Sequence, residues 1–165
     1  MKILVLSDSH ASRYFMRQCL DLTKPDAAVH LGDYYNDGQD MAEEYPQIPF
    51  YAVPGNCDRS RGYIPDPEIK LVTIGGVRFL LTHGHLHNVK MTLIRLLADA
   101  RAMGVDAVLF GHTHEAHCVR EEDGLWVMNP GSCGYGGGSA GLVLTHEGTI
   151  TACRLVMPAE LEETV

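Results

Sequence analysis

Short apolar runs of this sequence end repeatedly in side chains that can bind a metal ion. Five runs are followed by such residues: 2–7 by Asp8 and His10, 27–32 by Asp33, 50–55 by Asn56 and Asp58, 77–82 by His83 and His85, and 106–111 by His112 and His114. In open α/β sheets, ligands bind beyond the carboxyl ends of the strands, where residues far apart in sequence converge. The pattern therefore predicts one shared pocket.

The donors in that pocket would suit divalent metal ions. Carboxylates buried together are costly without a cation, because like charges shift pKa values and unpaired buried polar groups lose free energy. Carboxylate, amide oxygen and imidazole, without thiolate, favour Mn²⁺, Fe²⁺, Zn²⁺ or Co²⁺. The candidate ligands are more than one such ion needs and fit two ions that share a bridging carboxylate: Asp8, His10, Asp33, Asn56, His83, His112 and His114.

The elements that must position these residues alternate between strand and helix in the first half of the chain. Apolar runs predict strands over 2–7, 26–31, 49–53 and 106–110, and helical spacing predicts helices over 12–23, 37–45 and 89–103. Residues 69–74 and 77–81 flank Gly75-Gly76, which predicts a hairpin with a two-residue loop. We expect an antiparallel meander over 116–120, 125–128, 141–144 and 149–156, and a frayed acidic tail over about 158–165.

These elements indicate a single α/β domain over residues 1–165, in which two sheets pack together beneath helices. A doubly wound nucleotide-binding fold would share the first half. However, Ser7-Asp-Ser-His10 stands where a G-x-G-x-x-G loop is expected. The nucleotide-binding interpretation therefore lacks its main signal.

Composition narrows the classes of function. The 165 residues carry a net charge of -8, which gives no broad cationic surface for nucleic acid. An acidic protein that handles phosphates needs local positive charge, and bound metal is one source of it. We expect no signal peptide and no membrane span, since the apolar runs are short. The five cysteines form no C-x-x-C pair, which favours a cytoplasmic location.

The strand-end residues occur in ordered sequence blocks. These blocks are Asp8-Ser-His10, Gly32-Asp33, Gly55-Asn-Cys-Asp58, His83-Gly-His85 and Gly111-His-Thr-His114, followed by Asn129-Pro-Gly-Ser132. They resemble the D-x-H, G-D, G-N-x-[DE], H-G-H and G-H-T-H pattern of the calcineurin-like metallophosphoesterase superfamily. The short length and the G-N-C-D block look like its small YfcE-like bacterial and archaeal phosphodiesterase branch.

The resemblance implies a fold, a cofactor and a division of ligands. The fold is a four-layer α/β/β/α sandwich with two packed mixed β-sheets. The cofactor is a pair of divalent ions, Mn²⁺ first, with Fe²⁺, Zn²⁺, Co²⁺ or Ni²⁺ as alternatives. One ion would be held by Asp8, His10, Asp33 and His114. The other ion would be held by Asp33, Asn56, His83 and His112, so Asp33 would bridge the two.

Two ions in this arrangement favour hydrolysis of a phosphodiester by a bridging hydroxide, without a covalent enzyme intermediate. We expect a small or exposed phosphodiester as substrate, with Asp33, Asn56, Asp58 and His85 in catalytic roles. Many relatives carry a histidine where this sequence has Cys57, and a thiol matches that role poorly. The acid for the leaving group therefore stays open between water, His85 and none. Substrates with good leaving groups should depend on it least.

Two other functions remain open for the same residues. The superfamily includes a retromer subunit that serves chiefly in protein assembly, so a binding scaffold with weak or no catalysis is one alternative. A phosphomonoesterase or nuclease is the other. Self-association into a homo-oligomer is a further expectation, which comes from the resemblance.

Several residues near these blocks have ordinary interpretations. Asp58 would orient the loop that carries Asn56 or cap a turn. His85 would contact substrate, support a metal ligand or form a hydrogen bond with the nearby backbone. Arg59 and Arg61 could reach a phosphate, although a solvated loop is the simpler expectation. The glycine-rich segment 134–141 lacks the Lys-Ser/Thr ending of a P-loop and predicts a flexible connection. Packed or surface positions are expected for the remaining histidines, namely His30, His87, His117 and His146, and packed thiols for the cysteines other than Cys57.

Overall fold

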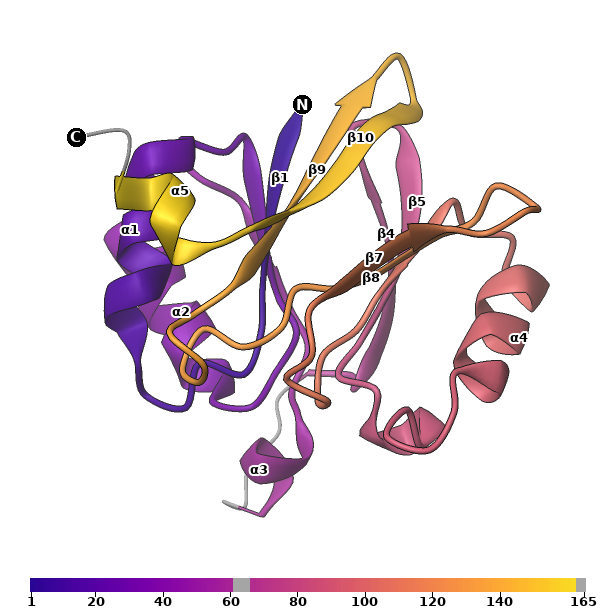
Figure 1. Cartoon of the computed structure of the whole chain (residues 1–165), viewed down its shortest axis with the longest axis horizontal. Coiled ribbons are helices and arrows are strands. Elements are labelled where there is room, and N and C mark those ends of the chain that lie inside the picture. Colours follow the sequence, from indigo (N-terminus) through magenta and orange to yellow (C-terminus); the bar gives the residue numbers. More distant parts are fainter. Residues whose placement is uncertain (61–65, 163–165) are drawn as a thin grey trace.

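Two five-stranded mixed sheets form the centre of the structure, a computed structural model that describes residues 1–60 and 66–162 (Figure 1). The first sheet has the order β10-β9-β1-β2-β3 and contains β1 (Lys2–Leu6), β2 (Ala27–His30), β3 (Phe50–Ala52), β9 (Ala140–His146) and β10 (Thr149–Val156). The second has the order β4-β5-β6-β8-β7 and contains β4 (Ile69–Ile74), β5 (Val77–Thr82), β6 (Ala107–Leu109), β7 (His117–Arg120) and β8 (Trp126–Asn129). Strands β1–β3 run parallel, as do β5, β6 and β8, whereas β9, β10, β4 and β7 pair antiparallel.

Helices cover the outer faces of both sheets, as the sandwich requires. Figure 1 shows α1 (Arg13–Thr23), α2 (Tyr35–Glu44) and α5 (Pro158–Glu162) beside the first sheet, and α4 (Ile94–Ala102) beside the second. The one-turn helix α3 (Asn56–Arg59) and the 3₁₀ helix η1 (His85–His87) follow β3 and β5 directly. The helices outside the two packed sheets confirm the predicted four-layer order. Within the described ranges, no helix combines the length and apolar character needed to cross a bilayer.

Alternation along the central strands explains how they are buried on both faces. In β1, Ile3 and Val5 belong to the core between the sheets, whereas Leu4 and Leu6 belong to the core under the helices. A third core packs Leu96 of α4 and its neighbours against the second sheet. Burial on two faces is why such strands read as continuous apolar runs, which made them easy to predict.

Three details differ from the sequence-based expectations. The predicted meander is wrong: β7 and β8 pair in the second sheet, whereas β9 and β10 belong to the first. The glycine-rich segment between β8 and β9 crosses from one sheet to the other, which alternation of apolar residues cannot reveal. The helix expected over 89–103 begins only at Ile94. The tail expected to fray forms α5 up to Glu162, and residues 163–165 lie outside the described part.

Candidate metal centre

Asp8, His10, Asp33 and His114 come together where the parallel strands of both sheets end. Their donor atoms lie within 4.8 Å of one another. His114 Nε2 is 3.1 Å from Asp8 Oδ1 and 3.4 Å from His10 Nε2, and His10 Nε2 is 3.8 Å from Asp33 Oδ2. These four residues are the set that the resemblance assigned to one ion. The convergence of strand ends has brought residues separated by more than 100 positions into one cluster.

The residues assigned to the other ion lie beside this cluster. His83 Nε2 is 3.2 Å from Asn56 Oδ1 and 3.4 Å from Asp33 Oδ1, and the His112 ring lies 5.0 Å from the His83 ring, centroid to centroid. His83 Nδ1 is 2.7 Å from the Leu31 carbonyl oxygen, which can only accept a hydrogen bond. Nδ1 of His83 therefore donates its proton to that carbonyl, which leaves Nε2 facing Asp33 and Asn56 as the nitrogen that could bind a metal ion.

Left-handed backbone at the strand ends aims these side chains at the pocket. Asp8, His10, Asp33, His112 and His114 have φ angles of 52°, 45°, 51°, 71° and 62°. Positive φ is uncommon for residues other than glycine and gathers at functional sites, where surrounding structure maintains the strain. The chain thus turns sharply at each of these positions.

Two glycines let the backbone approach the carboxylates closely. A Cβ atom on Gly55 would lie 2.3 Å from Asp33 Oδ1, and one on Gly111 would lie 2.1 Å from Ser7 Oγ and 2.7 Å from Asp8 Oδ2. Any larger residue at either position must displace a carboxylate or its partner. This contact explains the glycine of the Gly55-Asn and Gly111-His blocks.

The Asn129-Pro-Gly-Ser132 block ties the loops of the cluster together. The Asn129 side-chain amide donates to the Gly111 carbonyl and to Thr113 Oγ1, both at 2.9 Å. The Ser132 hydroxyl donates to the Asp8 carbonyl at 2.7 Å. This block therefore positions both ligand-bearing loops without contributing a candidate ligand.

A buried network supports the loop that carries His10. The Ser9 hydroxyl donates to Asp37 Oδ2 at 2.7 Å, the Ala11 N–H donates to the same oxygen at 2.9 Å, and His30 Nε2 lies 3.2 Å from the Ser9 hydroxyl. His30 is completely buried, as a packed histidine was expected to be, and burial lowers its pKa despite nearby Asp37. Sequence analysis missed Asp37, which looked like an ordinary helix residue.

Asp8 Oδ1 has the environment of a metal ligand. It is buried and makes no hydrogen bond with the part of the chain that the structure describes. In that same part, the basic nitrogens within 4.0 Å of the Asp8 and Asp33 carboxylates all belong to histidines. A buried carboxylate oxygen without a partner is costly, and a cation would satisfy it. The donor set therefore fits a divalent metal.

Protonation states in the pocket also suit metal binding. Burial alone would raise the pKa of Asp33, but the neighbouring His83 holds the pKa of that carboxyl well below its usual range. Burial, reinforced by His83, lowers the pKa of His112 to about 4, and burial also lowers the pKa of His10. Metal binding requires ionised carboxylates and neutral imidazoles, and the shifts of Asp33, His10 and His112 favour those states at neutral pH. His83 differs: burial alone would lower its pKa, but the contact with Asp33 raises it, so a metal ion would have to displace that proton.

Asp58 and Cys57 belong to α3, an element that the sequence analysis treated as a loop. Both carboxylate oxygens of Asp58 accept backbone hydrogen bonds at 2.8 Å, from Tyr35 N and from Gly55 N. The bond from Gly55 N caps α3, and the bond from Tyr35 N ties this helix to α2, so Asp58 has the contacts of both roles considered for it. Cys57 N donates to Asp33 Oδ1 at 2.9 Å, while burial raises the pKa of the Cys57 thiol to about 11.

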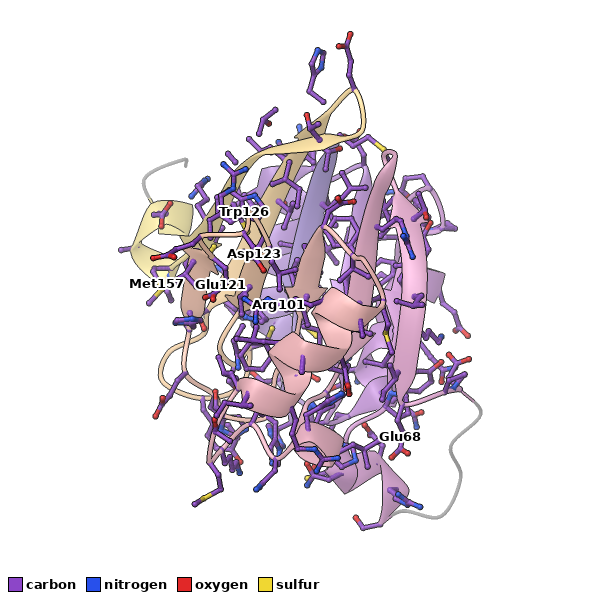
Figure 2. All side chains as sticks on the ribbon, turned by 90° about the vertical axis from the view of Figure 1, so that its right-hand side faces the viewer. Glu68, Arg101, Glu121, Asp123, Trp126 and Met157 are labelled. Carbon is purple, nitrogen blue, oxygen red and sulfur yellow. The ribbon has the colours of Figure 1, made fainter. Side chains whose placement is uncertain are left out.

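His85 lies at the edge of the centre, away from the cluster around Asp8. Its Nε2 is 3.2 Å from Glu68 Oε1, and its ring centroid is 5.5 Å from that of His83. Arg59 lies 3.6 Å from the same Glu68 oxygen, at the end of the molecule where Figure 2 labels Glu68. Sequence analysis missed Glu68, which no motif marks. Arg61 lies outside the described residues.

Aromatic rings border the opposite side of the centre. The Tyr135 ring stacks on His114, with centroids 5.0 Å apart and an angle of 14° between planes. Both Tyr34 and Tyr135 meet the His10 ring edge-on, at 5.3 and 4.8 Å. The glycine-rich segment around Tyr135 was expected to be only a connection. The structure places it against the cluster.

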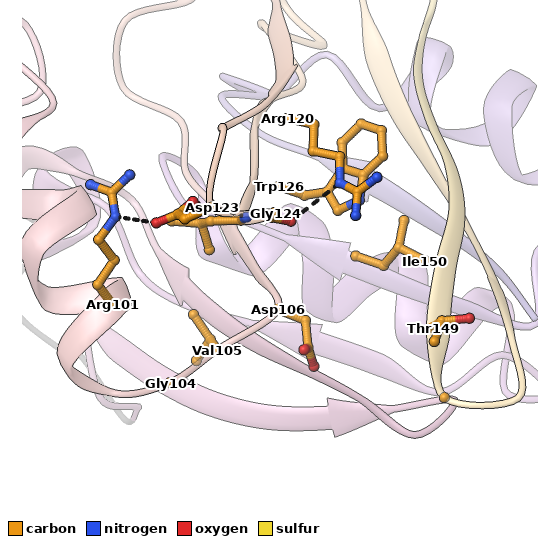
Figure 3. A pocket seen from close by; sticks show the side chains of 12 residues that line it. Arg101, Gly104, Val105, Asp106, Arg120, Asp123, Gly124, Trp126, Thr149 and Ile150 are labelled. Carbon is orange, nitrogen blue, oxygen red and sulfur yellow. Dashed lines mark hydrogen bonds and ion pairs between the residues drawn. The ribbon is translucent and has the colours of Figure 1, made fainter.

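A cavity of about 380 Å³ lies at the amino ends of β6 and β8 (Figure 3), whereas the candidate ligands follow the carboxyl ends of the parallel strands. Arg101 Nε donates to Asp123 Oδ2 at 2.6 Å across its rim, and the Arg120 guanidinium lies 5.8 Å from the Trp126 ring centroid. The Arg120 guanidinium also donates to the Gly124 carbonyl, and Asp106 accepts from the Arg78 N–H, so these charged groups have partners within the protein. They do not form a cluster of donors like the one around Asp8.

Sequence comparisons show what the chain resembles. The family model described as a calcineurin-like phosphoesterase superfamily domain matches residues 1–149. The chain is 32% identical over 137 residues to the probable metallophosphoesterase YsnB of Bacillus subtilis, covering 80% of this chain and 75% of that protein. It is 28% identical over 151 residues to the phosphodiesterase MJ0936 of Methanocaldococcus jannaschii, covering 82% and 86%.

Structural comparisons agree on the fold. A conserved protein of Streptococcus pneumoniae, described as a predicted phosphoesterase, matches with a TM-score of 0.76 and 23% identity, covering 94% of this chain and 88% of that one. Wild-type Vps29 of Entamoeba histolytica, complexed with Zn²⁺, matches with a TM-score of 0.69 and 20% identity, covering 94% and 98%. At these identities the likeness is one of fold.

Proposed function

Because this chain belongs to the calcineurin-like phosphoesterase superfamily, we propose that it is a metal-dependent phosphodiesterase with a dinuclear centre. One observation carries the proposal: the buried Asp8 Oδ1, which makes no hydrogen bond within the described residues, lies among the donors of His10, Asp33 and His114. His114 Nε2 lies 3.1 Å from this oxygen without forming a hydrogen bond, and a divalent cation between them would satisfy both groups.

The positions of the Asp33 oxygens support two ions rather than one. Oδ2 lies 3.8 Å from His10 Nε2, in the first group of donors, and Oδ1 lies 3.4 Å from His83 Nε2, in the second. One carboxylate thus faces both groups. Asp8, His10 and His114 would complete one site, and Asn56, His83 and His112 the other. When bound, the two ions would supply positive charge for the phosphate oxygens and lower the pKa of water.

The residues around the centre favour diesters with good leaving groups. The Cys57 thiol stands next to Asn56, and its raised pKa of about 11 makes it a poor proton donor at neutral pH. His85 is paired with Glu68 at the edge of the centre. We therefore expect p-nitrophenyl esters to react much faster than alkyl esters of similar size.

The test is hydrolysis of bis-p-nitrophenyl phosphate by protein treated with EDTA and then supplied with Mn²⁺. Wild type should be active only with Mn²⁺, and Asp33→Ala should lose at least a hundredfold in kcat/KM, because a ligand shared by both sites is gone. His146→Ala is the matched control, since that exposed side chain pairs only with Glu147 among described residues. Equal activity of wild type and Asp33→Ala, or activity unaffected by EDTA, would refute the proposal.

The same experiment separates the alternatives. Faster hydrolysis of p-nitrophenyl phosphate than of the diester would favour a phosphomonoesterase. Absence of metal binding, together with a protein that copurifies tightly, would favour the alternative function, a protein-binding scaffold of the same fold. The fold shared with Vps29 is compatible with a scaffold, but the four donors gathered around Asp8 support catalysis.

A further inference from the structure

Tyr135 forms an aromatic wall beside one group of candidate ligands. Its ring stacks on His114 at 5.0 Å and meets His10 edge-on at 4.8 Å. The residue is nevertheless 55% exposed. The ring therefore contacts the cluster while much of the residue faces solvent.

The backbone fixes Tyr135 at this position. Its N–H donates to Ser132 Oγ at 3.0 Å, and Ser132 in turn donates to the Asp8 carbonyl. Three residues further on, a Cβ on Gly138 would lie 2.8 Å from the Phe15 ring, so the segment is also closely packed at that end. The exposed ring is therefore held in place by the loops that carry the donors.

The glycines that follow Tyr135 keep the space next to it free. A Cβ atom on Gly136 or Gly137 would have no described atom within 4 Å. Both glycines have positive φ angles, 64° and 89°, which other residues rarely adopt. The two positions that follow Tyr135 therefore carry no side chain that would stand between the ring and a bound planar group.

The two sides of the centre differ in chemistry. On the far side, Glu68 lies 3.2 Å from His85 and 3.6 Å from Arg59, so that side is polar and charged. The side formed by Tyr135 is aromatic. A phosphodiester bound at the centre has two ester groups, and these surfaces would distinguish them.

We propose that Tyr135 is a specificity-determining residue that stacks on a planar ring in one ester group of the phosphodiester substrate, either a nucleobase or an aryl group. The inference rests on the proposed function, since the donor cluster sets where the phosphate binds. Aromatic rings prefer offset or edge contacts with centroids 4.5–7 Å apart, which the exposed ring permits. Stacking tolerates different bases because each has a π-face.

The experiment compares diesters that share the p-nitrophenolate leaving group and differ in the other ester: thymidine 5′-, phenyl and methyl p-nitrophenyl phosphate. The readout is the ratio of kcat/KM for each ring-bearing diester to that for the methyl diester. Tyr135→Leu should lower this ratio about tenfold, mainly through KM, and Tyr135→Phe should keep it. Tyr14→Leu is the control, because that exposed tyrosine bonds to Gln18 on α1.

Each outcome decides the inference. A lower ratio for thymidine alone assigns a nucleobase, and a lower ratio for phenyl as well assigns any planar ring. An unchanged ratio, or equal losses for all three diesters, would mean that Tyr135 only supports His114, and the inference would be wrong. If wild type hydrolyses no diester, the proposed function fails, and the inference is then tested by calorimetry with Mn²⁺-loaded protein. In that case Tyr135→Leu must weaken the binding of AMP about tenfold more than it weakens the binding of methyl phosphate.

Discussion

Replacing Gly111 with alanine should disturb Asp8 without changing any charge. The added Cβ would lie 2.1 Å from Ser7 Oγ and 2.7 Å from Asp8 Oδ2, whereas ordinary contacts begin near 3.4 Å. Ser7 and Asp8 are fully buried, and Ser7 Oγ donates to Asp8 Oδ2 at 2.5 Å, so the two side chains must move together. The φ angle of Gly111 is not positive, so alanine brings a steric cost and no left-handed strain.

Overpacking of this kind lowers the free energy of unfolding by about 1–3 kcal/mol. We also expect Mn²⁺ affinity to fall about 10–100-fold, since groups that orient metal ligands have effects of that size. Calorimetry gives the affinity, and urea denaturation of metal-free protein gives the stability. Gly141→Ala is the matched control, because its Cβ would lie 2.4 Å from Met128 Sδ in the core between the sheets. Equal Mn²⁺ affinities for Gly111→Ala and Gly141→Ala would show that this packing does not hold Asp8 for the metal.

Three further predictions concern stability. Asp58→Ala should lower the free energy of unfolding by about 1–3 kcal/mol in urea denaturation, because the N–H groups of Tyr35 and Gly55 lose their acceptor. Asp58→Asn should lower it less, and equal losses for the two variants would contradict this reasoning. Burial lowers the pKa of His30 below 6.5, so the unfolded state binds more protons as pH falls, and stability should decrease from pH 7 to 5. His30→Gln should show a shallower decrease in pH-dependent melts of metal-free protein, and an unchanged slope would exclude His30 as a cause. Mn²⁺ at 100 times its Kd for wild type should raise the free energy of unfolding of wild type by about 2.7 kcal/mol. The same concentration should raise that of Asp8→Asn far less, and an equal increase would mean that Asp8 is not a metal ligand.

The fold was largely predictable because its central strands are buried on both faces. Runs such as Ile3–Leu6 carry apolar residues without interruption, and the Gly75-Gly76 turn fixes the register of β4 and β5. The sheet to which β9 and β10 belong could not be predicted in this way. Local alternation sets which residues face a core, but the partner of a strand depends on contacts far along the chain, such as Val5 with Gly141.

The candidate site was predictable where a side chain type itself indicates chemistry. The spacing placed all seven candidate ligands in one pocket, the resemblance grouped Asp8, His10, Asp33 and His114 on one ion, and the structure brings these four together. Their roles as ligands stay predictions. Residues that act through shape or hydrogen bonds escaped notice: Asp37 looks like a helix surface residue, and Glu68 and Tyr135 belong to no ligand block. Such roles arise from three-dimensional neighbours, which one sequence does not display.

The late return of the chain to its first strand has a consequence for synthesis. β1 gains its antiparallel neighbour β9 only when residues 140–146 are available, and the Asp8 carbonyl is held by Ser132. A nascent chain on the ribosome therefore carries Asp8, Asp33 and His83 long before their loops are locked. If the proposed centre forms, metal binding should be one of the last events of biogenesis, so a polypeptide truncated before Ser132 should bind Mn²⁺ no better than its unfolded form.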